Sequence, residues 1–167
     1  MKKYHDEEWG RPVHDDIKLF EMLILEGKSC GLSWELILKK RKHMMAVFDN
    51  FNPEILANYN AAKLDELMQD PGVIRHRLKL IAVVENAKVY FKINDLHGSL
   101  DKFLWRYVNF QPIIRFSPEV ITRSDISDKL SKDLKKLGFK FCGSTIIYSF
   151  MQAVGMINAH ELDCFAR

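Results

Sequence analysis

The sequence predicts an all-α protein. Apolar residues recur at the three- and four-residue spacing of helices along most of its 167 residues, and no alternating run is long enough for a strand. No internal repeat is visible, which argues against a solenoid. Because 47% of the residues are apolar, a chain of this length can bury one core, and we expect a single domain.

Composition limits the functions that the chain can have. A net charge of +3 permits a nucleic-acid partner but does not require one. Three cysteines, an odd number without a C-x-x-C pair, argue against a disulfide framework and favour a reducing compartment. No segment approaches the roughly 18 apolar residues of a membrane span. We therefore expect a cytoplasmic protein without a membrane partner.

The first 50 residues predict a loop and two helices. Residues 1–14 lack a helical period and are punctuated by Gly10 and Pro12, so we expect a lid or strap. Asp15 or Asp16 can cap a first helix, which Gly27 can end. Ser33 can cap the next helix, whose flank carries the basic run 39–42. The break between the two helices, residues 26–31, then holds Glu26 close to Trp34.

The remaining elements follow from caps and apolar periods. We expect short helices after Asn52-Pro53, Asn60 and Gly98-Ser99, and a long helix from Val73 to about Ile93 that begins with the basic cluster 75–79. Residues 111–122 contain two prolines and read as a loop. Residues 127–137 and 146–154 form an amphipathic helix and a buried helix, joined by the turn 138–143.

Glu26 is the first candidate for a functional side chain. It falls in the last turn of the predicted helix, where the macrodipole disfavours a carboxylate by a few tenths to about 1 kcal/mol. An acid beside the flat ring of Trp34 suits a planar, nitrogen-rich ligand. The alternatives are an exposed helix end for Glu26 and core positions for Tyr4, Trp9 and Trp34.

Two further patterns suggest ligands. Two glycines five residues apart, Gly138 and Gly143, can leave main-chain N–H groups pointing outward to hold a phosphate, although an ordinary helix connection has the same pattern. His160-x-x-x-Cys164 has a spacing known in zinc sites, and His5 could supply a third ligand. A stray surface pair is the alternative. The basic runs 39–42 and 75–79 are either solvated helix faces or DNA contacts.

Five segments together resemble DNA-3-methyladenine glycosylase I, the constitutive, monofunctional alkylpurine branch of the helix-hairpin-helix glycosylases. They are YHDEEWG (4–10), LFEMLILEGKSCGLSWELILKKR (19–41), GVIRHRLKL (72–80), FLWRYVN (103–109) and LSKDLKKLGFKFCGSTIIYSFMQAVGMINAH (130–160). The resemblance covers nearly the whole chain, and the E-G-x-x-x-G-L-S-W string and the F-K-F-x-G turn are its most specific parts.

The resemblance implies a helix-hairpin-helix glycosylase fold with two helical lobes flanking a base-binding cleft. One lobe would span about residues 15–125, and residues 1–14 and 126–167 would form the other, with the hairpin and a zinc site. It also implies that the chain flips 3-methyladenine out of double-stranded alkylated DNA and hydrolyses its N-glycosidic bond without lyase activity. Free 3-methyladenine would be the product, and the protein would act as a monomer.

The family's functional residues carry over by position. Glu26 matches the pocket carboxylate that reads the adenine edge, and Trp34 and Tyr4 match its aromatic walls. Gly31 and Leu32 match the loop that enters the gap in the duplex. The hairpin positions that match the phosphate anchor are Gly138, Phe139, Lys140, Phe141, Gly143 and Ser144. The positions that match zinc ligands are His5, His160 and Cys164.

The sequence departs from the family at its start. Family members carry a cysteine and a tryptophan upstream of the tyrosine-histidine pair, supplying a fourth zinc ligand and another pocket wall, whereas here Met1-Lys2-Lys3 precedes Tyr4. Other helix-hairpin-helix glycosylases use an aspartate after the hairpin, but we assign Asp163 no role. Two alternatives therefore stand beside the glycosylase: a catalytically impaired protein that only binds DNA or lesions, and a small-ligand or metal-tethered helical protein.

Overall fold

The computed structural model of the protein describes residues 1–115 and 119–166. Its longer helices are α2 (Asp16–Ser29), α3 (Trp34–Val47), α6 (Arg77–His97), α8 (Asp125–Leu137) and α9 (Ser144–Ala153). Its shorter helices are α1 (Lys2–Glu7), α4 (Pro53–Leu56), α5 (Ala61–Gln69) and α7 (Leu100–Trp105), with the 3-10 turns η1 (Asp49–Phe51) and η2 (Arg106–Val108). The predicted all-α class is confirmed. None of the helices in these ranges is both long and apolar enough to cross a membrane.

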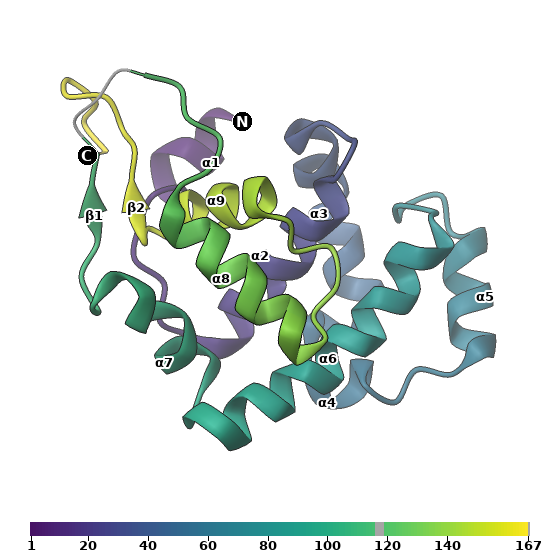
Figure 1. The fold of residues 1–167 in the computed structure, drawn as a ribbon. Helices are drawn as coiled ribbons and strands as arrows, with labels where there is room; N and C mark the ends of the chain where they lie inside the picture. Colours follow the sequence, from purple (N-terminus) through teal and green to yellow (C-terminus); the bar gives the residue numbers. More distant parts are fainter. Residues whose placement is uncertain (116–118, 167) are drawn as a thin grey trace.

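Helix α2 lies at the centre of the fold. It contacts α3, α6, α7 and α9, and it is buried without interruption from Leu19 to Lys28. Figure 1 shows α8 and α9 on one side of α2 and α5 at the far end of the molecule. One cluster of buried side chains runs through all these helices, from Leu19 to Ile157. The segments of the two predicted lobes therefore share a core.

Polar side chains start most of the helices as the sequence predicts. Asp15 accepts a 2.8 Å hydrogen bond from the main-chain N–H of Lys18, which settles the choice between Asp15 and Asp16 as the cap of α2. Ser33 caps α3, and Ser124 and Ser127 form a reciprocal capping box at α8. Helix α9 differs, because its cap is Gly143 and no side chain bonds its first N–H groups.

Two expectations near the N-terminus are wrong. Residues 1–14 are not a loop throughout, because α1 occupies Lys2–Glu7. Helix α2 does not end at Gly27 but continues to Ser29. Gly27 has a different purpose: a β-carbon there would lie 3.1 Å from the Phe141 carbonyl oxygen, so the glycine permits close approach of the 138–143 turn.

The later elements show smaller differences. The long helix begins at Arg77 rather than Val73, because His76 caps it. Leu78 and Ile81, in its first turns, are apolar but 63% and 38% exposed. Two-residue parallel strands, β1 (Ile113–Ile114) and β2 (Ile157–Asn158), are too short to leave a period in the sequence. Strand β1 lies within the expected loop 111–122, so this segment is not a loop throughout, and its residues 116–118 fall outside the described residues.

Candidate active site

Three aromatic and acidic side chains from three helices meet at one end of α2. The rings of Tyr4, on α1, and Trp34, the first residue of α3, have centroids 5.7 Å apart and are tilted by 54°. Burial, then the charge of Glu26 and then that of Glu8 raise the pKa of the Tyr4 hydroxyl, so the Glu26 carboxyl group is close enough to act on Tyr4. The structure thus brings together the three side chains that the sequence singled out as a pocket.

The Glu26 side chain is buried without a partner. It is 5% exposed, and none of the residues in the described ranges donates a hydrogen bond to its carboxylate. Burial alone raises its pKa to about 8. Unpaired buried carboxylates are costly, so such groups are frequent at functional sites. A ligand with N–H donors would satisfy this carboxylate, whereas an exposed helix end, the alternative for Glu26, is excluded.

A partly buried ion-pair network connects the end of α1 to α2 and α3 beside this site. Arg41 on α3 donates to Glu21 on α2 (Nε to Oε1, 2.7 Å) and to Glu8 after α1 (NH1 to Oε2, 2.9 Å). Lys18 lies 3.0 Å from Glu21 and 3.4 Å from Glu8. The sequence left Arg41 open as a DNA contact or a solvated residue, but its side chain is 12% exposed and serves neither purpose. It ties the helix of Tyr4 to the helix of Glu26.

The segment between α2 and α3 turns sharply outward. Gly31 has a φ of +75°, a backbone conformation that favours glycine, and the Leu32 N–H donates to the Ser29 carbonyl at 2.7 Å. The Leu32 side chain is 40% exposed. We call Gly31 and Leu32 the wedge loop. An exposed apolar side chain at a tight turn is of the kind that can wedge between bases of a duplex.

The turn between α8 and α9, the hairpin of residues 138–143, is folded back onto the protein. Gly138 has a φ of +103° and ends α8. The side chain of Phe139 is 3% exposed and belongs to the core, which corrects its predicted place among DNA contacts. Lys140 is exposed, but its N–H and C=O both bond to Asn86 and do not point outward. Among the described residues, the main-chain N–H groups of Phe141, Gly143 and Ser144 have no hydrogen-bond acceptor, so these groups could meet a phosphate.

An open groove of about 580 Å³ lies beside the start of α9. Four cations and one acid are among the residues that line it, together with two serines: Arg123, Lys132, Lys135, Lys136, Asp128, Ser131 and Ser144. Ser144 donates to Asp128, so this acid already has a partner. A β-carbon at Gly143 would meet nothing within 4 Å, which leaves room in front of the helix start. The charge and the space suit a phosphate.

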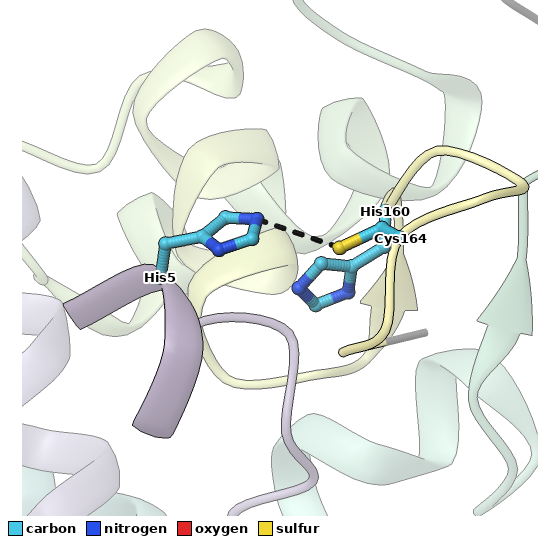
Figure 2. A group of neighbouring side chains, drawn as sticks. All are labelled: His5, His160 and Cys164. Carbon is cyan, nitrogen blue, oxygen red and sulfur yellow. Dashed lines mark hydrogen bonds between the residues drawn. The ribbon is translucent and has the colours of Figure 1, made fainter. Parts of the chain in front are cut away.

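Three potential metal ligands lie together where the two ends of the chain meet. Figure 2 shows His5 on α1 facing Cys164, with His160 beside them, and the Cys164 Sγ lies 3.8 Å from the His5 Nε2. All three ligand atoms lie within 4.8 Å of one another. Donors around a tetrahedral zinc lie roughly 3.3–3.8 Å apart, given bonds of about 2.0–2.3 Å. The three donor atoms are therefore a candidate metal site, somewhat wider than the coordination shell of a tetrahedral zinc.

Neighbouring oxygens orient both imidazoles. The Nδ1 of His5 lies 3.0 Å from the Asp6 carboxylate, and the Nδ1 of His160 lies 3.0 Å from the Asn158 side-chain oxygen. An Nδ1–H donated to such an oxygen leaves Nε2 as the metal-binding nitrogen. Gly10 makes room for His160, because a β-carbon there would lie 2.4 Å from the ring.

The comparisons with known proteins bear on this geometry. The chain matches the model of the family described as methyladenine glycosylase over residues 1–167.

The chain belongs to the methyladenine glycosylase family.

Named relatives agree with this methyladenine glycosylase assignment. The chain is 44% identical to a DNA-3-methyladenine glycosylase of Haemophilus influenzae over 96% of this chain and 89% of the relative. It is 46% identical to DNA-3-methyladenine glycosylase 1 of Escherichia coli K12, over 96% and 88%. The predicted resemblance and the predicted glycosylase activity are confirmed.

Solved structures confirm the fold. A variant of 3-methyladenine DNA glycosylase I in complex with 3-methyladenine superposes with a TM-score of 0.96 at 42% identity, covering 99% of this chain and 90% of that one. The Staphylococcus aureus enzyme, solved to study 3-methyladenine recognition, gives 0.96 at 43% identity, covering 99% and 89%. The roles of individual residues in this methyladenine glycosylase remain predictions.

Sequence reasoning missed the groups that hold the site in place. In this methyladenine glycosylase, Arg41, Lys79 and Asn86 each bond to a segment that carries predicted site residues. Each had a faint signal in the sequence. Asn86 interrupts the apolar face of α6, and Glu21 lies among Phe20 and Met22, where an acid needs a buried cation. The sequence alone does not show which cation pairs with Glu21.

Proposed function

We propose that this methyladenine glycosylase flips the damaged nucleotide out of double-stranded DNA and reads the base with Glu26 between Tyr4 and Trp34. The observation that carries the proposal is the buried, unpartnered Glu26 carboxylate beside two aromatic rings. An ionised carboxylate only accepts hydrogen bonds, so it selects the N–H donors on the edge of an adenine. The rings supply stacking surfaces for a planar base.

The chemistry needs no strong acid. Methylation at N3 makes the bound adenine cationic, so the C1′–N9 bond can break with its electron pair passing to the base, which leaves as neutral 3-methyladenine. Water adds to C1′ of the electron-poor sugar and gives up its proton to solvent, and no lysine Schiff base forms. The buried carboxylate supports this step, because a negative charge in a dry site stabilises a neighbouring positive transition state.

The DNA contacts fall on two segments. The wedge loop, Gly31 and Leu32, fills the gap that the flipped nucleotide leaves, and the start of α9 at Gly143 and Ser144 binds a backbone phosphate. The exposed Leu32 side chain supports the first role. The uncapped N–H groups of α9 and the cations of the adjoining groove support the second.

Zinc joins the two ends of the chain in this proposal. His5, His160 and Cys164 would hold the ion, which would supply a structural cross-link between α1 and the segment after β2 and take no part in the reaction. Since His5 follows Tyr4, a fixed His5 also fixes one wall of the pocket. The spacing of the three donors supports this role.

Release of free 3-methyladenine from methylated duplex DNA tests the proposal. Glu26→Gln keeps the size of the side chain but loses charge-assisted hydrogen bonds of about 1.5–3 kcal/mol, so release should fall roughly 10- to 150-fold. The matched control is Glu54→Gln, which changes an exposed glutamate of α4 and should leave release unchanged. Unchanged release by folded Glu26→Gln protein would remove Glu26 from its role.

A further inference from the structure

Helix α6 carries two buried polar side chains that face other segments of the fold. Lys79 is 7% exposed and Asn86 is 3% exposed. They are seven residues apart, close to two turns of helix, so both lie on one face of α6. Each bonds to main-chain groups that directly precede a segment to which the proposed function assigns DNA contacts.

Lys79 holds the end of α2. Its ammonium group donates to the carbonyls of Lys28 at 2.8 Å and of Cys30 at 2.6 Å. The last carbonyls of a helix have no partner within the helix, and a cation there also complements the helix dipole. The wedge loop begins with the next residue, Gly31. The ammonium therefore fixes the point and the direction at which this loop leaves the protein.

Asn86 holds the hairpin. Its side-chain Nδ2 donates to the Lys140 carbonyl at 3.1 Å, and its Oδ1 accepts from the Lys140 N–H at 2.7 Å. Both main-chain groups of one hairpin residue are thus engaged by one amide. The hairpin also packs on Gly27 of α2 through Phe141, so it is fixed against two helices.

We propose that Lys79 and Asn86 are positioning residues, which set the separation between the wedge loop and the phosphate-binding start of α9. The inference rests on the proposed function of these two segments. Directional hydrogen bonds from one straight helix fix the relative positions of two main-chain segments, which apolar contacts of the same volume do not. DNA must meet both segments at once, so a small change in their separation weakens the productive complex without altering the base pocket.

The test separates duplex processing from base binding. For Asn86→Leu and Lys79→Met we expect kcat/KM on methylated duplex DNA to fall about 10- to 100-fold. Affinity for free 3-methyladenine, measured by tryptophan fluorescence, should stay unchanged, because it needs only the pocket. Lys79→Arg, which keeps a cationic donor, should recover most of the activity. Asn94→Leu makes the same substitution elsewhere on α6 and should behave as wild type.

The double variant tests the shared separation directly. Once either segment is released the separation is lost, so Asn86→Leu with Lys79→Met should lose much less than the product of the two single losses. Two results would overturn the inference. One is a double variant whose loss of kcat/KM equals the product of the two single-variant losses. The other is an affinity for free base that falls together with duplex activity and melting temperature. Release by the wild type shows that the proposed function itself holds. If wild type binds free base but releases none from DNA, that function fails instead.

Discussion

Replacing Gly143 with aspartate should strengthen the fold while weakening DNA binding. The residue has the extended backbone of a helix cap, with φ −59° and ψ 156°, and it leaves the first N–H groups of α9 without a side-chain acceptor. An added β-carbon would meet nothing within 4 Å. Aspartate is therefore sterically acceptable, and it is among the best capping residues.

The two expected effects have opposite signs. A better cap contributes a few tenths of a kcal/mol and the helix dipole adds about 0.3–1 kcal/mol, so the melting temperature should rise by roughly 1–4 °C for a chain of this size. The same carboxylate occupies and repels the phosphate site. The loss of hydrogen bonds to a charged group is worth about 1.5–3 kcal/mol, or roughly 10- to 150-fold in Kd.

Fluorescence anisotropy with a duplex, measured over a series of salt concentrations, gives both affinity and the number of phosphates bound. The slope of log K against log salt is negative, and its magnitude should fall by about 0.9 for the Gly143→Asp variant because one phosphate contact is lost. Gly143→Asn is the control, since it caps the helix without a charge and should lose less affinity. A Gly143→Asp variant that is more stable and binds duplex with wild-type affinity and slope would refute the phosphate site.

Three other changes test other parts of the site. Burial raises the pKa of Glu26 from about 4.5 to about 8, so this group favours the folded state below pH 4.5 and its contribution is lost as the pH rises through 8. Wild type should lose stability relative to Glu26→Gln between pH 5 and 9 in thermal melts, and its kcat/KM should rise through about pH 8. Arg41→Met removes a charge-assisted hydrogen bond of about 1.5 kcal/mol from each of Glu21 and Glu8, with Lys18 remaining beside both, and should cost about 3 kcal/mol in urea unfolding. Cys164→Ser should lower zinc content from one ion per purified chain, and a chelator should reduce the melting temperature of wild type only.

Each of these expectations has a clear contrary result. Parallel stability curves for wild type and Glu26→Gln would mean that the carboxyl group is not desolvated. An Arg41→Met variant as stable as wild type would show that the ion pairs contribute nothing net, a known outcome for some buried pairs. Wild type that is purified without zinc, or whose melting temperature a chelator leaves unchanged, would remove zinc from the structure.

Local signals in the sequence predict the fold well where they are strong. The caps at Ser33, Asn52 and Asn60 are placed correctly, because a short polar side chain before an apolar period has few other uses. The sequence-based predictions fail where a residue's role depends on tertiary contacts. Gly27 looks like a helix stop, and the close approach of Phe141 that explains it comes from a segment over a hundred residues later.

The residues of the candidate site also fall into those that the sequence predicts and those that it does not. Glu26, Tyr4 and Trp34 could be found because they carry a chemistry that a family resemblance names, and the structure brings them together. Arg41 and Asn86 could not be found, because a cation in a basic run and an asparagine in a helix acquire their purpose only from their partners. Site residues have a recognisable chemistry, whereas the residues that position them are identified by contacts alone.

The end of α2 shows why these contacts matter for function. Consecutive residues of a helix point about 100° apart, so Glu26 faces Tyr4 while Gly27 faces the hairpin. The carbonyls of Lys28 and Cys30 then turn to α6. One helical turn thus fixes the base-reading carboxylate, the hairpin and the start of the wedge loop. The base-reading carboxylate and the DNA-contacting segments are thus anchored on the same short stretch of chain, and the polar side chains of α6 set those segments relative to a pocket that can bind a base without them.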